Sequence, residues 1–270
     1  MKVFISADME GISGVVAGQQ TGPEGKEYER ARKLMTAEVN AAVEGALAAG
    51  AEAIVVNDAH GSMRNILIEE LNPAARLISG WPKPLSMMQG IDEGFDAAFF
   101  VGYHAQAGTA HSILDHTYAG IVYQVHLNGR PMGETGLNAA LAGYFGVPVV
   151  LLTGDRLVVE EGRALLGPAL QGVAVKESYG RVAAKCLPPS LAQERIRAAA
   201  QAALPTPVPP FRLEPPITLT VDFTSSAHAD MAELIPGARR EAGRRITYVH
   251  DDYLTLYKAW RAMLTLAHAS

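Results

Sequence analysis

Three apolar runs of the sequence are each followed by side chains that can bind metals or transfer protons. Asp8 and Glu10 follow the first run, His60 follows the second, and His104 follows the third, while Glu134 stands in the stretch MGETG. Two carboxylates placed close together repel each other unless one takes up a proton or a cation lies between them. Oxygen ligands alone favour magnesium, whereas imidazole favours zinc and its first-row neighbours. The residue types therefore point to a metal site.

The number of these residues indicates more than one metal ion. Five side chains are too many for one tetrahedral zinc that must keep an open position for substrate. They suffice for two ions if one carboxylate bridges them, and a pair roughly 3.5–4 Å apart can activate water for attack on carbon or phosphorus. Each residue alone also has a structural interpretation, such as a helix cap, a loop charge or a core histidine. Their joint occurrence favours the metal site.

The elements that must position these residues alternate between strand and helix. Apolar runs predict strands at residues 2–7, 53–56, 76–79, 97–101, 121–127 and 147–152, and helical periodicity predicts helices at 27–49, 135–145 and 191–203. Continuous apolar strands are typical of a parallel sheet flanked by helices, which makes this an α/β protein. The carboxyl ends of parallel strands open into one crevice, so we expect the candidate ligands to meet there.

A proline-rich connector, PTPVPPFRLEPP at residues 205–216, divides the chain. It separates a predicted α/β core at residues 1–204 from a smaller C-terminal α/β subdomain at residues 217–270. The subdomain has predicted strands at 217–223 and 245–249 and helices at 227–234 and from 251 onward. The last helix carries more apolar side chains than one face needs, so we expect it to contact another subunit or cover a sheet; packing within one chain is the alternative.

Composition excludes several classes of partner. The 270 residues are 49% hydrophobic and carry a formal net charge of −5, without a long cluster of basic residues, so nucleic acid and acidic membranes are not expected partners. No apolar run approaches membrane-spanning length, and no signal segment is recognisable. The single cysteine, Cys186, excludes an internal disulfide. These features predict a cytoplasmic protein.

Five stretches of the sequence resemble a known family in order and spacing. They are SADMEGISG, VNDAHGSM, LISGWPKPLSMMQGID, FVGYHAQAGT and MGETGLNA, and the resemblance to the DppA-type D-aminopeptidases, zinc-dependent bacterial peptidases, extends to about residue 260. It implies a site with two Zn²⁺ per chain, bridged by Asp8, with ligands at Asp8, Glu10, His60, His104 and Glu134.

The resemblance also implies a catalytic histidine, an activity and an assembly. The family uses a further histidine in the loop after GYHA, and His116 matches it by its distance from Gly120. The loop is one residue longer here, so His111 is the alternative. The implied substrates carry an N-terminal D-residue, such as D-Ala-D-Ala or short D-alanine peptides and amides. The implied assembly is a homo-oligomer, a ring-shaped decamer.

Two other functions compete with this interpretation. Asp8-Met9-Glu10-Gly11 resembles the Asp-x-Asp-Gly signature of haloacid-dehalogenase-like phosphohydrolases, which use magnesium and would phosphorylate Asp8. That function leaves His60 and His104 without a role. A non-catalytic α/β ligand-binding protein is the second alternative, and tight binding without turnover would distinguish it.

Overall fold

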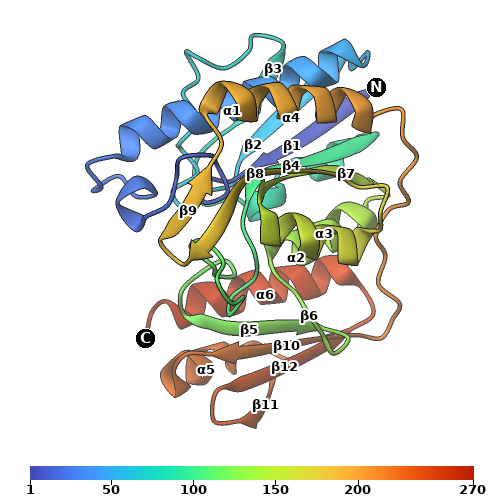
Figure 1. Ribbon diagram of the computed structural model, residues 1–270. Helices are drawn as coiled ribbons and strands as arrows, with labels where there is room; N and C mark the ends of the chain where they lie inside the picture. Colours follow the sequence, from blue (N-terminus) through green and yellow to red (C-terminus); the bar gives the residue numbers. More distant parts are fainter.

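A computed structural model describes residues 1–270 and contains two sheets with helices packed on and between them (Figure 1). The first sheet is parallel apart from its last strand, which runs antiparallel to its neighbour. Its strands, in spatial order, are β3 (Ala75–Ile78), β2 (Ala53–Asp58), β1 (Lys2–Ala7), β4 (Ala97–Tyr103), β7 (Val149–Asp155), β8 (Gln171–Gly180) and β9 (Ala183–Cys186). The chain therefore passes from β1 to β2 on one side and returns to β4 on the other. Such a switch point opens a crevice at the carboxyl ends of the strands.

The second sheet is antiparallel and draws on two distant parts of the chain. Its order is β11 (Arg239–Ala242), β12 (Arg245–His250), β10 (Ile217–Phe223), β5 (Val122–Leu127) and β6 (Arg130–Pro131). Asn128 and Gly129 connect β5 to β6 with φ of 49° and 76°, the left-handed conformation that a two-residue hairpin requires.

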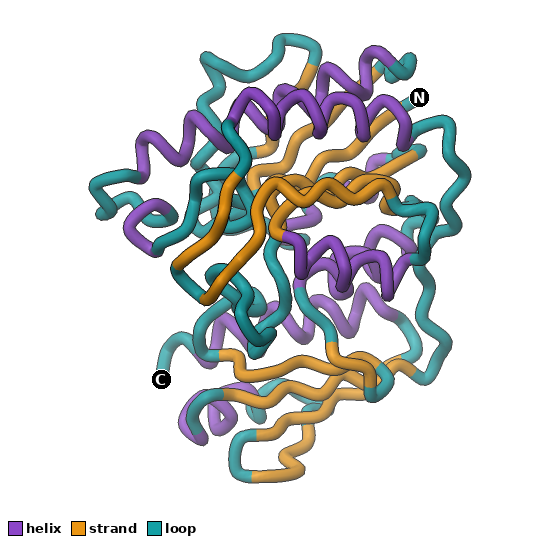
Figure 2. The backbone as a smooth tube through the Cα atoms, viewed as in Figure 1, coloured by secondary structure: helices purple, strands orange, loops and turns teal.

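Helices form layers on both sides of the first sheet (Figures 1 and 2). One face is covered by α1 (Tyr28–Ala48) and α4 (Pro189–Ala203), and the other by α2 (Glu134–Tyr144) and α3 (Arg156–Leu166). The helix α6 (Tyr253–Ala267) lies between this layer and the second sheet, and α5 (Ser226–Ala232) packs beside it. Single 3₁₀ turns occur at Gly18–Gln20, Ser86–Met88 and Ile91–Glu93.

Alternation along β1 divides the core into two parts. Val3 and Ile5 belong to the apolar cluster beneath α1 and α4, whereas Phe4 belongs to the cluster shared with α2 and α6. Successive side chains of a strand point to opposite faces, so a fully buried strand needs apolar residues on both. The charged residues that follow β1 are thereby held at the end of a rigid, fully covered strand.

The α/β fold predicted from the sequence is confirmed, and every strand and helix predicted there is present with ends within three residues of those expected. The sequence did not predict β6, β8, β9, β11 or α3. The strand at 121–127 pairs with β10, although the chain-order division placed it in the 1–204 core. This pairing joins residues 92 to 101 positions apart in the chain, and local sequence contains no sign of it. The domain boundaries at 204 and 217 stay a prediction.

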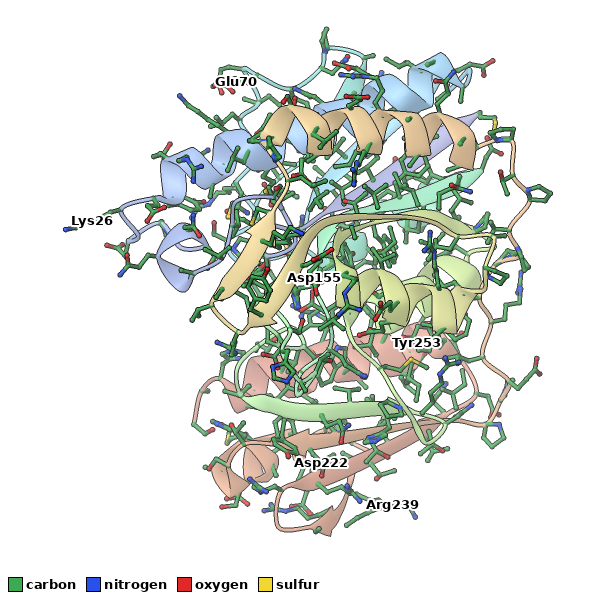
Figure 3. All side chains as sticks on the ribbon, viewed as in Figure 1. Lys26, Glu70, Asp155, Asp222, Arg239 and Tyr253 are labelled. Carbon is green, nitrogen blue, oxygen red and sulfur yellow. The ribbon has the colours of Figure 1, made fainter.

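The last helix covers a sheet, as expected, and its apolar side chains are buried within the chain. Tyr257, Trp260 and Met263 have no exposed surface, and the α6 residue Tyr253, labelled in Figure 3, is also buried. These residues therefore give no sign of a subunit interface. None of the helices combines the length and the apolar character needed to cross a bilayer.

Candidate metal centre

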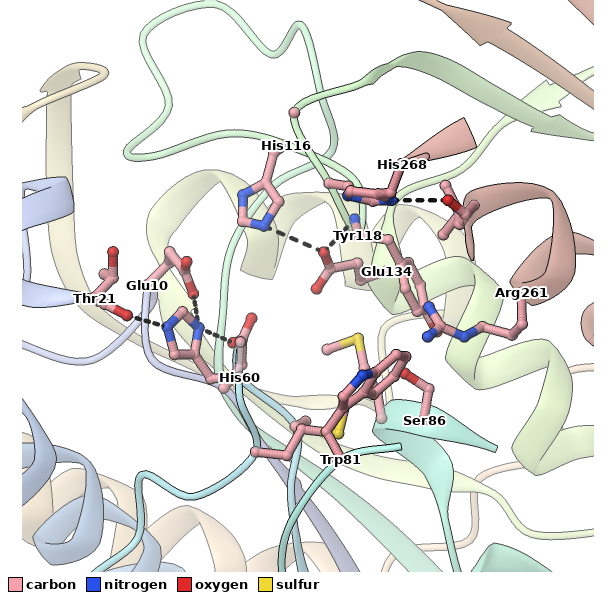
Figure 4. Close-up of a pocket in the computed structure, with 18 of the residues that line it drawn as sticks. Glu10, Thr21, His60, Trp81, Ser86, His116, Tyr118, Glu134, Arg261 and His268 are labelled. Carbon is pink, nitrogen blue, oxygen red and sulfur yellow. Dashed lines mark hydrogen bonds and ion pairs between the residues drawn. The ribbon is translucent and has the colours of Figure 1, made fainter. Parts of the chain in front are cut away.

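All five candidate ligands lie together at the carboxyl edge of the first sheet. Glu10, His60 and Glu134 are labelled among the pocket residues in Figure 4. Asp8 is at the centre, because its Oδ1 lies 3.1 Å from His60 Nδ1 and its Oδ2 lies 3.4 Å from His104 Nε2. Glu10 Oε2 is 2.9 Å from the same His60 nitrogen, and Glu134 Oε2 is 3.4 Å from His104 Nε2. Each of the five side chains is buried, with at most 8% of its residue surface exposed.

The segments that follow β1, β2 and β4 supply four of the five residues, and the start of α2 supplies the fifth. Asp8 and Glu10 follow β1, His60 follows β2, and His104 follows β4. Glu134 is the first residue of α2, directly after the β5–β6 hairpin, and its Oε1 accepts a hydrogen bond from Tyr118 N at 2.6 Å. The site thus forms where the two layers meet.

Two glycines allow the loops after β1 and β4 to cross closely. A Cβ on Gly11 would lie 1.9 Å from Tyr103 O, and one on Gly102 would lie 2.3 Å from Asp8 O. Backbone hydrogen bonds join the same loops, from Asp8 N to Val101 O and from Gly11 N to Gly102 O, both at 2.8 Å. The approach is possible only without side chains, so these glycines fix the spacing of the ligands.

A buried lysine organises the loop that carries Glu10. Lys176 extends from β8, is 2% exposed, and donates from Nζ to the carbonyl oxygens of Glu10, Ile12 and Val15. Burial lowers its pKa to about 8. Three carbonyl acceptors compensate the ammonium for its lost hydration, so the loop has one favoured conformation.

Each histidine at the site is anchored through one ring nitrogen by a backbone carbonyl. The pairs are His60 Nε2 with Thr21 O at 2.6 Å, His104 Nδ1 with Ala105 O at 3.0 Å and His116 Nδ1 with Leu114 O at 2.8 Å. A carbonyl oxygen can only accept, so the anchored nitrogen carries the hydrogen. The other nitrogen faces the carboxylates, and in the neutral form of each ring it has the lone pair that could bind a metal ion. This arrangement is typical of histidines that ligate metals, whose second nitrogen donates to a carbonyl or carboxylate.

The donor set fits a metal ion. Buried atoms without hydrogen-bond partners include Asp8 Oδ2, Glu10 Oε2 and His104 Nε2, which all face the same space. The contact of Glu10 Oε2 with His60 is short but lacks the alignment of a hydrogen bond. Two groups of three side chains each bring their donor atoms to within 4.8 Å of one another, and the two groups share His104. The groups are Asp8, Glu10 and His104, and His104, His116 and Glu134.

The electrostatics of the cluster favour added positive charge. Burial and the charge of Glu10 raise the pKa of Asp8 to about 7. Burial opposes the charged form of His60, but Glu10 and Asp8 outweigh it and hold the His60 pKa well above its usual value. Burial likewise opposes protonation of His104, and the carboxylate of Glu134 raises that pKa well above its usual value. Three buried carboxylates create a field that a cation would satisfy.

A pocket of about 610 Å³ opens above the cluster, a size suited to a small molecule or short peptide. His116 lines it, with a side chain that is 24% exposed, whereas the side chain of His104 is fully buried. The His116 ring stacks on His104 with centroids 4.1 Å apart, and its Nε2 lies 3.6 Å from Glu134 Oε1. His111 is exposed and does not line the pocket. The geometry therefore favours His116 over His111 for contact with a substrate.

Comparison with known proteins agrees with this geometry over the full chain. Residues 1–262 match the model of the peptidase M55 family, described as D-aminopeptidase. The chain belongs to the M55 family of D-aminopeptidases. A D-aminopeptidase of Bacillus subtilis strain 168 is 37% identical over 270 residues, covering 99% of this chain and 98% of the relative. The solved structure of the Zn-dependent D-aminopeptidase DppA from B. subtilis, described as a self-compartmentalizing protease, superposes with a TM-score of 0.96 at 36% identity, covering 100% of this chain and 99% of the other.

Membership of the M55 family makes the chain a hydrolase and leaves the phosphohydrolase alternative without support. In that alternative Asp8 would be a free nucleophile. Here Asp8 is enclosed by His60 and His104, and both imidazoles have positions in the site.

Several residues that line or support the candidate site of this M55 chain were not predicted from the sequence. Lys176 lies in β8, and its charge ends the apolar run from which a strand would be predicted. Tyr118 and Arg261 line the pocket from a loop and from α6, where the sequence shows no pattern of chemistry. The stretch LISGWPKPLSMMQGID contains Trp81, Ser86 and Met87, which also line the pocket, so the family motif was the available signal.

Proposed function

We propose that this protein is a dinuclear zinc aminopeptidase that removes N-terminal D-residues from short peptides and amides, D-Ala-D-Ala among them. One observation carries the proposal. Three imidazoles, each anchored by a backbone carbonyl, direct their free nitrogens at three buried carboxylates on the floor of one pocket. Family membership and the zinc dependence of the B. subtilis relative support the choice of metal and reaction.

The residues that would hold the two ions are Asp8, Glu10, His60, His104 and Glu134. The central position of Asp8, with each oxygen facing a different histidine, suits a bridging ligand. Bound zinc would supply Lewis acidity, which polarises a carbonyl group and makes water a stronger nucleophile near neutral pH. The carbonyls of Thr21 and Ala105 keep His60 and His104 in the tautomers that ligation requires.

His116 would transfer protons at the scissile bond. Its Nδ1–H donates to Leu114 O, so Nε2 is the basic nitrogen, and this atom faces the pocket beside Glu134. A general base takes a proton from the attacking water, and its conjugate acid can return that proton to the leaving amine. Because the ring stacks on His104, His116 is held at a fixed height above the buried cluster.

We further propose that the subunits assemble into a homo-oligomer, a ring-shaped decamer. The B. subtilis relative is described as a self-compartmentalizing protease, which supports an assembly that encloses its active sites. Analytical ultracentrifugation at micromolar concentration tests this. A monomer under these conditions would contradict the assembly. A cytoplasmic location stays a prediction.

Metal analysis combined with paired substrates tests the activity. The purified protein should contain close to two zinc ions per chain and release D-alanine from D-Ala-D-Ala much faster than it releases L-alanine from L-Ala-L-Ala. Efficient cleavage of the L-peptide would overturn the substrate and leave the metal site standing. Magnesium-dependent phosphatase activity with no bound zinc would overturn both.

A further inference from the structure

Arg261 lies in the same pocket as the metal centre, on the side away from His60 and Glu10 (Figure 4). It extends from α6, and its guanidinium carbon is 5.2 Å from the centre of the Trp81 ring and 5.1 Å from that of Tyr118. A guanidinium between two aromatic faces is stabilised by both and keeps its N–H groups directed outward at the edges. The two rings therefore hold a fixed positive charge in the pocket wall.

This guanidinium has no acidic partner within the chain. None of the fourteen ion pairs involves Arg261, whereas Arg181, Arg197, Arg240 and Arg245 all pair with carboxylates. Arginine carries five N–H donors in a planar fork and stays charged at any physiological pH. A half-buried cation with these donors free is suited to an anionic ligand.

Tyr118 links Arg261 to the metal centre. The Tyr118 backbone N–H donates to Glu134, and its hydroxyl bonds to Asn138 and Tyr257, each at 2.7 Å. The neighbouring α6 residue Trp260 is fully buried. The stacking surface beneath the guanidinium is thus connected through one residue to a candidate ligand.

We infer that Arg261 binds the C-terminal carboxylate of the substrate, so that the enzyme selects short D-peptides with a free acid. This inference rests on the proposed function, which places the scissile carbonyl at the metal centre. A short peptide then extends across the pocket toward α6, where the planar fork of Arg261 matches a carboxylate in two parallel hydrogen bonds. An amide in place of the acid accepts fewer charge-assisted bonds and leaves the guanidinium uncompensated.

The test compares one peptide in two forms, D-Ala-D-Ala and D-alanyl-D-alaninamide, using zinc-loaded enzyme. Arg261→Met should raise KM for the acid by about 10- to 100-fold, the size of a hydrogen bond to a charged group, and leave kcat within about threefold. The amide should change little, so the preference for the acid disappears. Arg261→Lys keeps the charge and should retain part of that preference, which also covers the case in which the methionine variant misfolds.

Arg244→Met is the matched control. Arg244 also lies over an aromatic ring, Tyr123 at 5.9 Å, but on the exposed face of the second sheet, so its variant should behave as wild type. Equal losses for acid and amide in Arg261→Met, or a wild type without preference for the acid, would overturn the inference. If the wild type cleaves neither peptide, the proposed function fails. Calorimetric titration of both peptides then still tests the inference. Tighter binding of the acid that is lost in Arg261→Met supports it, and equal binding of acid and amide refutes it.

Discussion

The strands β4 and β7 of the first sheet are buried along their whole length, whereas β10, in the middle of the second sheet, alternates between buried and half-buried residues. A strand covered on both faces can place polar groups only at its ends, and in the parallel sheet those ends share one edge. The candidate ligands lie at that edge. The second sheet has one face toward solvent, and its role at the site is to support α6 and the loop that leads to Glu134. The layer formed by the first sheet and its helices thus supplies the candidate ligands, and the layer formed by the second sheet and α6 completes the pocket around them.

Charged side chains also differ in exposure to solvent between the two layers. At the carboxyl edge of the first sheet several charged residues are buried, as Asp155 illustrates: it is fully buried at the end of β7 and caps α3 through Leu157 N. Figure 3 shows Asp222 and Arg239 on the outer sheet, where charges face solvent. We therefore expect substitutions in the first layer to have large effects and those in the second to have small ones.

The largest effect is expected at Glu134, where the two layers meet. Glu134→Ala removes a candidate ligand and should weaken metal binding by more than about 100-fold. The purified protein should therefore contain at least one zinc ion fewer per chain and should no longer hydrolyse its substrate. Elemental analysis and D-alanine release measure both. Glu160→Ala, at an exposed position on α3, is the control. Full metal content in Glu134→Ala would remove this residue from the ligand set.

The next effect separates the catalyst from the ligands. His116→Ala should keep near-normal zinc content and fold while turnover falls by roughly 10²–10⁴, the usual contribution of a general acid–base group. His111→Ala should change turnover little, because His111 is exposed and outside the pocket. Zinc loss in His116→Ala would instead make it a ligand of the group that contains His104 and Glu134.

A smaller effect concerns the pH dependence of stability in the first layer. Glu38 of α1 is 2% exposed, accepts a hydrogen bond from Ser13 N at 2.8 Å, and has a pKa that burial raises from 4.5 to about 7. The folded state thus binds a proton that the unfolded state releases, so this stabilisation is complete below pH 4.5 and is lost as pH rises through 7. Its full size is about 3 kcal/mol.

Glu38→Gln cannot ionise and should therefore gain stability relative to wild type as pH rises. Urea unfolding of both proteins at pH 5 and pH 8, under equal metal concentrations, gives the two differences. The free energy of unfolding of Glu38→Gln, relative to that of the wild type, should be higher at pH 8 than at pH 5. An unchanged difference between these pH values would show that Glu38 is ionised throughout.

The smallest effect is expected in the second sheet. Arg245 and Asp222 form two parallel hydrogen bonds across β10 and β12, at 2.9 and 2.8 Å, and the arginine side chain is 45% exposed. Arg245→Ala should lower stability by less than about 1 kcal/mol, as is usual for surface pairs, and leave D-alanine release unchanged. A larger loss in urea unfolding would show that the outer sheet depends on its charges as strongly as the inner one.

Sequence was a good guide wherever a function follows from the end of a buried strand. Asp8, Glu10, His60 and His104 could be placed together because parallel strands share an edge, and Glu134 was a candidate from its position at a predicted helix start. The family resemblance added His116 as an expectation. Their roles stay predictions, although the structure brings them together: two donor groups share His104, and His60 contacts Asp8 and Glu10.

The remaining parts depend on contacts between distant residues. The strand β8 contains Lys176, whose charge conceals the strand until its three carbonyl partners are known. The pairing of β5 with β10 is likewise non-local, so chain order could not assign it. Arg261 is one arginine among many in the sequence, and only its position between Trp81 and Tyr118 distinguishes it.

The ammonium of Lys176 also affects how the enzyme acquires its metal. In many small zinc proteins the ion drives folding, so the apo chain is unstructured. Here a cation that belongs to the chain bonds to the carbonyls of Glu10, Ile12 and Val15, so we expect the loop to be ordered before metal binds. Chains synthesised during zinc shortage would therefore persist as a folded reserve. They would become active when the ion returns, without renewed synthesis.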